Sequence, residues 1–103
     1  MSVLRIAVVG AGAMGRLHAR AVTRRAESVG DCRLEVVVDH YRNRAENVAA
    51  EFGGRAEESG YSDWSAVDAA IVAIPTVGHA SVATALLEAG LDVLLEKPMA
   101  LSV

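Results

Sequence analysis

Three glycines near the start of the chain stand at Gly10, Gly12 and Gly15, directly after the short apolar stretch Leu4–Val9. In a strand that turns into a helix, the first such glycine allows the tight turn. The second lets a phosphate approach the backbone, and the third lets the helix pack closely on the strand. The spacing therefore predicts a site for the pyrophosphate of a dinucleotide.

Backbone dipoles would hold this anion, because the chain as a whole is acidic. Its formal net charge is −3 at pH 7, which argues against a general affinity for nucleic acid or an anionic membrane surface. The amides of Ala13 and Met14 would stand unpaired at the helix start, where the helix dipole also favours a negative charge. We therefore expect a dinucleotide partner, and neither a nucleic acid nor a membrane.

A carboxylate follows the next apolar stretch, since Asp39 stands at the end of the predicted strand Leu34–Val38. There it can accept hydrogen bonds from an adenosine ribose and would repel a 2′-phosphate, which favours NAD over NADP. Arg42 and Arg44 leave the NADP alternative open, because either could reach a 2′-phosphate by turning inward. The glycine loop and this acid are further apart than the usual ~20 residues, so we expect a long loop around Glu27–Arg33.

Apolar periodicity predicts alternating strands and helices around these residues. The predicted strands are Leu4–Val9, Leu34–Val38, Ala69–Ile74 and Asp92–Leu95, and the predicted helices are Met14–Arg25, Asn43–Phe52 and His79–Ala89. Asn43 is the expected N-cap of its helix, with Glu46 three residues on. The polar segment Arg55–Val67 indicates at most a short third strand, with Tyr61 and Trp64 packed at the sheet edge. This order predicts an α/β fold of Rossmann type, a doubly wound parallel sheet in three αβα layers.

Several classes of protein are excluded by what the sequence contains. Cys32 is the single cysteine, which excludes an internal disulfide and a cysteine metal cluster. The apolar stretches are too short to span a bilayer, and no signal-peptide pattern precedes them. A length of 103 residues suits one domain. We therefore expect a cytoplasmic protein with no bound metal.

Two motifs in the second half carry a more specific signal. They are Ala73–His79 (AIPTVGH) and Ala89–Pro98 (AGLDVLLEKP). Together with the glycine loop they resemble the Gfo/Idh/MocA oxidoreductase family, which includes glucose–fructose oxidoreductase and inositol dehydrogenases. The resemblance extends from the glycine loop to Pro98, except that Arg55–Val67 does not clearly show the family's usual short strand.

The resemblance implies that Ile74, Pro75 and Thr76 line the cofactor near its ribose and nicotinamide. It places His79 at the start of the following helix, also against the cofactor. From its chemistry, a histidine there is favoured as a helix-terminal hydrogen-bonding group over a catalyst.

Glu96 and Lys97 match the family's Glu-Lys-Pro triplet at the end of the last predicted strand. The resemblance implies that both contact the cofactor, with the glutamate beside the nicotinamide, and that Lys97 lies by the reacting carbon as the catalytic residue. A lysine ammonium can donate to a developing alkoxide or carbonyl oxygen. The alternative is a surface ion pair worth less than about 1 kcal/mol.

The implied function is that of an NAD(P)-dependent dehydrogenase acting on the CH–OH group of a sugar, cyclitol or related alcohol. Family members carry a second, mostly β-sheet domain for substrate contacts and oligomer formation, and residues 1–103 do not encode it. We therefore expect a fragment or truncated form of a two-domain homo-oligomeric oxidoreductase, which binds cofactor without turnover. The alternative is a non-enzymatic sensor or regulator on the same fold; Lys97 favours the enzyme, because a sensor needs no proton donor.

Overall fold

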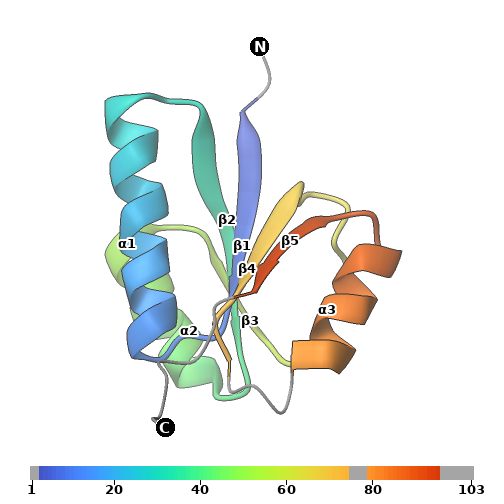
Figure 1. The fold of residues 1–103 in the computed structure, drawn as a ribbon. Helices are drawn as coiled ribbons and strands as arrows, with labels where there is room; N and C mark the ends of the chain where they lie inside the picture. Colours follow the sequence, from blue (N-terminus) through green and yellow to red (C-terminus); the bar gives the residue numbers. More distant parts are fainter. Residues whose placement is uncertain (1–2, 75–78, 96–103) are drawn as a thin grey trace, which may run out of the picture.

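The computed structural model describes residues 3–74 and 79–95, with the backbone alone at His79. The strands are β1 (Leu4–Val9), β2 (Cys32–Asp39), β3 (Arg55–Glu58), β4 (Ala69–Val72) and β5 (Asp92–Leu95), and the helices are α1 (Ala13–Ser28), α2 (Arg42–Phe52) and α3 (His79–Glu88). The strands form one five-stranded parallel sheet in the order β3-β2-β1-β4-β5 (Figure 1). The predicted parallel α/β sheet is confirmed.

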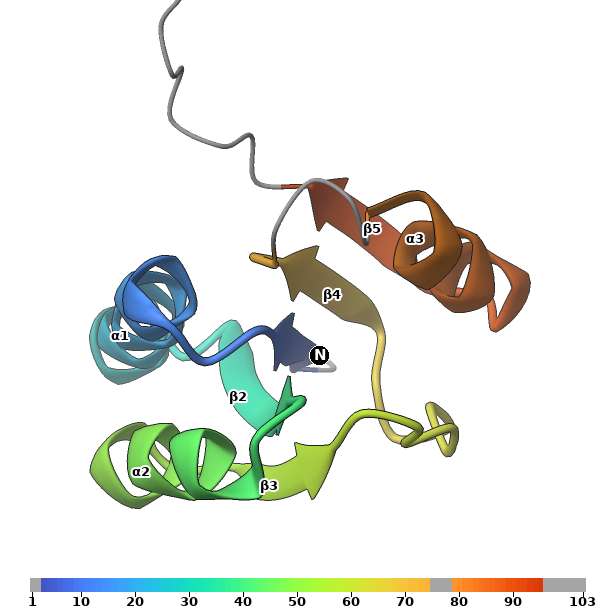
Figure 2. The ribbon, with the colours of Figure 1, turned by 90° about the horizontal axis from the view of Figure 1, so that it is seen from below.

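Helices cover both faces of this sheet, as the view onto the carboxyl ends of the strands shows (Figure 2). Helices α1 and α2 lie on one face and α3 lies on the other, so the three αβα layers are confirmed. Successive strand residues point to opposite faces: Val8 and Val37 pack under α1 and α2, whereas Val9 and Val38 belong to the cluster on the α3 face. Burial on both faces explains why these strands are continuously apolar.

The connection between α1 and β2 is short, so the predicted loop around Glu27–Arg33 is wrong. Helix α1 continues to Ser28 and β2 begins at Cys32. An ion pair between Arg25 Nη2 and Asp31 Oδ2, at 2.7 Å, spans the turn, and the carbonyl of Asp31 accepts the amide of Leu4 at 3.0 Å. The additional residues therefore lengthen the helix and the strand rather than the loop.

Helix α2 begins before the predicted cap. Its N-cap is Tyr41, which makes no side-chain capping hydrogen bond, and Asn43 lies inside the first turn. Glu46 pairs with Arg42, four residues earlier on the same helix, at 3.4 Å. The turn before the helix is held instead by Asp39, whose Oδ2 accepts the Tyr41 amide at 2.9 Å. The prediction of Asn43 as N-cap is wrong for this reason.

The segment Arg55–Val67 contains the third strand after all. Residues of β3 pair in parallel with Val36–Asp39 of β2 and are partly or fully exposed at the edge of the sheet. The rings of Tyr61 and Trp64 meet edge to face with centroids 4.9 Å apart and pack against the cluster on the α3 face. None of the helices in the described ranges is long and apolar enough to cross a membrane.

Candidate dinucleotide-binding site

The glycine loop joins β1 to α1 at the carboxyl edge of the sheet, where two of its glycines are required by packing. Gly10 has φ +108°, and a side-chain methyl there would collide with the carbonyl oxygen of Ala73 beyond β4. Its amide donates to the Val38 carbonyl of β2 at 2.7 Å. A methyl on Gly15 would collide with the Gly10 carbonyl oxygen, so glycine is what lets α1 approach the loop so closely.

Gly12 differs from the other two, because no described backbone atom crowds the space above it. It is the N-cap residue of α1, and a methyl there would meet one described atom within 4 Å, Nη1 of Arg44 at 3.8 Å. The amides of Ala13 and Met14 in the first turn have no partner within the helix, and both residues are exposed. An anion can therefore approach the helix N-terminus here, which fits the predicted pyrophosphate site.

Asp39 lies directly against this loop and is 9% exposed. Its Oδ1 accepts the Ala11 amide at 2.8 Å, and its Oδ2 accepts the Tyr41 amide at 2.9 Å. The structure thus brings together the acid and the loop, which lie far apart in the sequence. Each carboxylate oxygen carries a further lone pair, so Asp39 can still accept a ribose hydroxyl.

An apolar recess of about 260 Å³ opens on the α3 face near the same edge. Val9 and Val38, the last apolar residues of β1 and β2, line it together with Tyr61, Trp64 and Val82. Apolar and aromatic walls of this kind suit a flat, weakly polar ring. From the sequence, the two aromatic residues are expected only to pack at the sheet edge. Their grouping within the one segment without periodicity is the signal that could have identified them.

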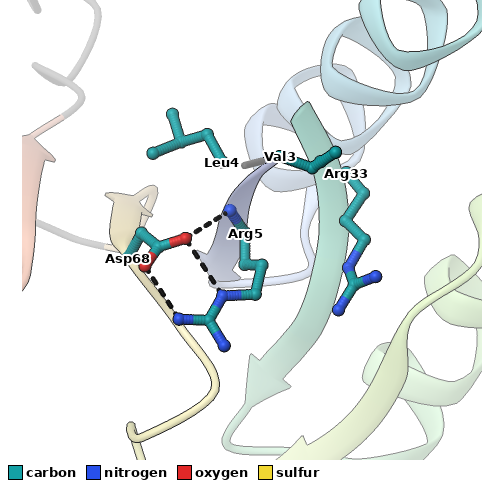
Figure 3. A pocket seen from close by; sticks show the side chains of 5 residues that line it. All are labelled: Val3, Leu4, Arg5, Arg33 and Asp68. Carbon is teal, nitrogen blue, oxygen red and sulfur yellow. Dashed lines mark hydrogen bonds and ion pairs between the residues drawn. The ribbon is translucent and has the colours of Figure 1, made fainter. Parts of the chain in front are cut away.

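A larger hollow, of about 720 Å³, lies at the opposite end of the strands (Figure 3). Arg5 donates to Asp68 through its amide and its guanidinium, at 2.8 to 3.0 Å. These hydrogen bonds lower the pKa of Asp68 to about 2. Arg33, on the same wall, pairs with Glu35 at 2.9 Å. The pair between Arg5 and Asp68 holds the start of β4 beside β1. Because the charged side chains that line the hollow are paired within the chain, we do not take it as a second candidate site.

The predicted site residues of the second half are only partly described. Ile74 is half-buried, and its Cγ2 would lie 3.0 Å from a methyl on Gly10, so it stands beside the glycine loop. His79 is the first residue of α3. Pro75, Thr76, Glu96 and Lys97, and the side chain of His79, lie outside the described residues. Among the described residues, no group of three or more His, Cys, Asp or Glu side chains could hold a metal ion.

Comparison with known proteins also indicates a dinucleotide-binding domain, along nearly the whole chain. Residues 4–103 match the model of an oxidoreductase family with an NAD-binding Rossmann fold, the Gfo/Idh/MocA family. The chain is 40% identical over 101 residues to inositol 2-dehydrogenase 1 of Saccharopolyspora erythraea, covering 94% of this chain and 29% of that protein. It is 36% identical over 98 residues to UDP-N-acetylglucosamine 3-dehydrogenase of Acidithiobacillus ferrooxidans, covering 95% and 29%. The chain therefore spans less than a third of the length of these relatives.

Solved structures agree with this assignment. GenD2 from gentamicin A biosynthesis, in complex with NAD, superposes with a TM-score of 0.81 at 33% identity, over 99% of this chain and 29% of that one. KijD10, a 3-ketoreductase from Actinomadura kijaniata in complex with NADP, gives 0.78 at 27% identity, over 94% and 31%. Similar domains thus bind either dinucleotide. From the glycine loop to the last strand, this chain belongs to the Gfo/Idh/MocA oxidoreductases and forms their NAD-binding Rossmann domain.

Proposed function

We propose that this chain is the cofactor-binding part of a two-domain oxidoreductase. The enzyme would transfer hydride between a nicotinamide dinucleotide and a sugar, cyclitol or related alcohol. The observation that carries the proposal is the 2.8 Å hydrogen bond from the Ala11 amide to Asp39, because it joins a phosphate-binding loop to a ribose acceptor. The sugar and inositol dehydrogenases among its relatives support the substrate class, and their threefold greater length supports a second domain.

The site suits a dinucleotide lying across the carboxyl edge of the sheet. The pyrophosphate would lie over Gly12 and the first-turn amides of Ala13 and Met14, where the backbone is open. The adenosine ribose would meet Asp39, and the recess beside Val38 suits the adenine ring. Because a 2′-phosphate would face the Asp39 carboxylate, we favour NAD over NADP.

The nicotinamide end would then extend toward β4 and β5. We assign Ile74, Pro75, Thr76 and His79 to contacts along this half of the cofactor. When bound, a nicotinamide ring supplies the carbon that accepts or returns the hydride. Its neighbours in this proposal are Glu96 and Lys97, which the described ranges do not include.

Lys97 has the proton-transfer role. In alcohol oxidation its Nζ would take the hydroxyl proton as the hydride leaves the adjacent carbon, and in reduction it would return that proton to the carbonyl oxygen. This role distinguishes the enzyme from a cofactor-binding sensor on the same fold, which needs no such group. The two-domain protein would be cytoplasmic and homo-oligomeric.

Calorimetric titration of the purified chain with NAD⁺ and NADP⁺ tests the cofactor assignment. We expect NAD⁺ to bind more tightly, and we expect no dehydrogenase activity of residues 1–103 with any polyol, because they span less than a third of the length of the dehydrogenases they match. A clear preference for NADP⁺ would contradict the choice of NAD, and binding of neither would contradict the proposed site. NADH formation by this chain alone would show that a second domain is dispensable.

A further inference from the structure

The two arginines at the start of α2 have different surroundings. Arg42 is paired with two carboxylates, Glu46 at 3.4 Å and Glu58 at 3.5 Å. Arg44 faces the candidate site: its Nε lies 3.8 Å from Oδ2 of Asp39, and Nη1 is the described atom nearest the open space over Gly12. Its guanidinium carbon also lies 4.6 Å from the centre of the Tyr41 ring. Of the two, Arg44 alone is placed beside the ribose acceptor.

The contacts of Arg44 are weak enough to be exchanged. Its side chain is 49% exposed although Asp39 is buried, and its Nε lies 3.8 Å from the carboxylate, too far for a hydrogen bond. Asp39, in contrast, is held by two backbone amides at 2.8 and 2.9 Å. The carboxylate is therefore fixed, and the guanidinium can turn without disturbing it.

We infer that Arg44 allows the adenosine end of this site to bind a 2′-phosphate. It would thereby reduce the difference between the affinities of the site for NAD and NADP. With NAD⁺ bound, Arg44 remains the counter-ion of Asp39. With NADP⁺ bound, its guanidinium turns to the 2′-phosphate, an anion that its planar fork can bind through two hydrogen bonds. The inference rests on the proposed function, since it assumes that the chain binds a nicotinamide dinucleotide.

The test compares Arg44→Gln with Arg42→Gln, which removes the same charge one half-turn away. Dissociation constants for NAD⁺ and NADP⁺ are measured by calorimetry for both variants and the wild type. We expect Arg44→Gln to weaken NADP⁺ binding about tenfold or more, since even one of the two charge-assisted hydrogen bonds is worth that much, and to change NAD⁺ binding by less than about threefold. Arg42→Gln should leave the ratio of the two constants within about twofold, because it removes only an exposed charge.

Salt provides a second measurement on the same proteins. Wild-type affinity for NADP⁺ should fall more steeply with ionic strength than affinity for NAD⁺, and Arg44→Gln should remove most of that difference. Equal shifts of the ratio in the two variants, or no shift in either, would overturn the role of Arg44 while leaving dinucleotide binding intact. If the wild type binds neither dinucleotide, the proposed function fails and the inference fails with it.

Discussion

The two halves of the sheet differ in how completely the described chain covers them. The half made of β1, β2 and β3 lies under α1 and α2, and Val8 and Val37 within it are fully buried. On the same face, no helix of the described ranges covers β4 and β5 (Figure 2). Leu94, in register with Ile71 of β4, is 57% exposed there. The first half, which holds the glycine loop and Asp39, is thus covered by helices and is called the closed half below, whereas the second half exposes apolar side chains on this face.

Under the proposed function, the pyrophosphate and ribose contacts would lie in the first half and the catalytic group in the second. The loop, Asp39 and Arg44 all belong to the closed half and contact one another. Parallel sheets are normally covered on both faces, so we expect the β4–β5 half to be the less stable one. A substitution of the catalytic group should then leave dinucleotide affinity nearly unchanged, and a substitution in the phosphate-binding loop should leave the chemical step unchanged.

The strongest test of this division is Lys97→Ala in the two-domain protein. We expect turnover to fall by about 10²–10⁴-fold, the usual contribution of a positioned acid or base. NAD⁺ affinity should stay within about threefold, because the proposed pyrophosphate and ribose contacts lie in the other half, at the glycine loop and Asp39; a change of that size is small beside one hydrogen bond to a charged group. Steady-state kinetics and calorimetry measure the two effects.

Lys97→Arg serves as the control for charge, and it should restore little activity, since a guanidinium does not release its proton near neutral pH. Strongly weakened NAD⁺ binding with intact turnover would instead make Lys97 a cofactor-binding group. Absence of any hydride transfer in the wild-type two-domain protein would favour a sensor.

Gly15→Ala and Gly12→Ala separate stability from binding within the closed half. The added methyl at Gly15 collides with the backbone at Gly10, so we expect the free energy of unfolding to fall by about 3 kcal/mol or more, at the upper end for overpacking. At Gly12 the methyl meets a single flexible side-chain atom at 3.8 Å. Gly12→Ala should therefore cost less than about 1 kcal/mol yet abolish NAD⁺ binding. Urea denaturation and calorimetry check these results; equal destabilisation by both would contradict the different roles.

Asp39→Ala tests whether the acid supports the loop even without a ligand. It leaves the buried Ala11 amide and the Tyr41 amide without their acceptor, so we expect a loss of about 1–3 kcal/mol in the free energy of unfolding. Asp31→Ala is the matched control, because Asp31 pairs with the exposed side chain of Arg25, and it should change stability little. Denaturation of the ligand-free chain measures both, and an unchanged midpoint for Asp39→Ala would show that the acid acts on the ligand alone.

The smallest effect concerns the pair that joins the two halves at the end away from the site. Arg5 lowers the pKa of Asp68 from 3.8 to about 2, so the unfolded chain binds a proton there before the folded chain does. The pair therefore stabilises the fold above pH 3.8 and loses this contribution as the pH falls toward 2. Because the Asp68 side chain is 34% exposed, solvent screening keeps the effect small.

Denaturation midpoints measured across this acidic range should depend less on pH in Asp68→Asn than in the wild type. Arg5→Gln should flatten the dependence in the same way, because it breaks the same pair. A wild-type slope retained in both variants would contradict this account.

The sequence predicted the parts of the fold that depend on local pattern. Continuous apolar runs identified β1 and β5, and the glycine spacing identified the loop. The short strand β3 has three charged residues among its four, Arg55, Glu57 and Glu58; its pairing with β2 depends on backbone hydrogen bonds at the sheet edge, which leave no apolar period. Asn43 failed as an N-cap because the turn is held by a residue from the preceding strand.

Less of the site was predictable. Asp39 and the glycine loop were recognised as partners because the motif includes both. The choice between Arg42 and Arg44 stayed open in the sequence, since it depends on where Glu58 and the loop lie in space. The recess lined by Tyr61 and Trp64 likewise requires the packing of α3 on the sheet. Such features arise from tertiary contacts that no local pattern encodes.

Cys32, the first residue of β2, allows local unfolding of the molecule to be followed by thiol labelling. The thiol is 6% exposed under α1, and burial raises its pKa, so the reactive thiolate is scarce and shielded in the native state. An alkylating reagent should therefore modify it only in molecules whose α1–β2 packing has opened. Because this is the chain's single thiol, each modified molecule records one opening event. Dinucleotide bound to the native state should lower the rate of thiol modification in proportion to its occupancy. Ligand binding can therefore be measured from the modification rate, without denaturant.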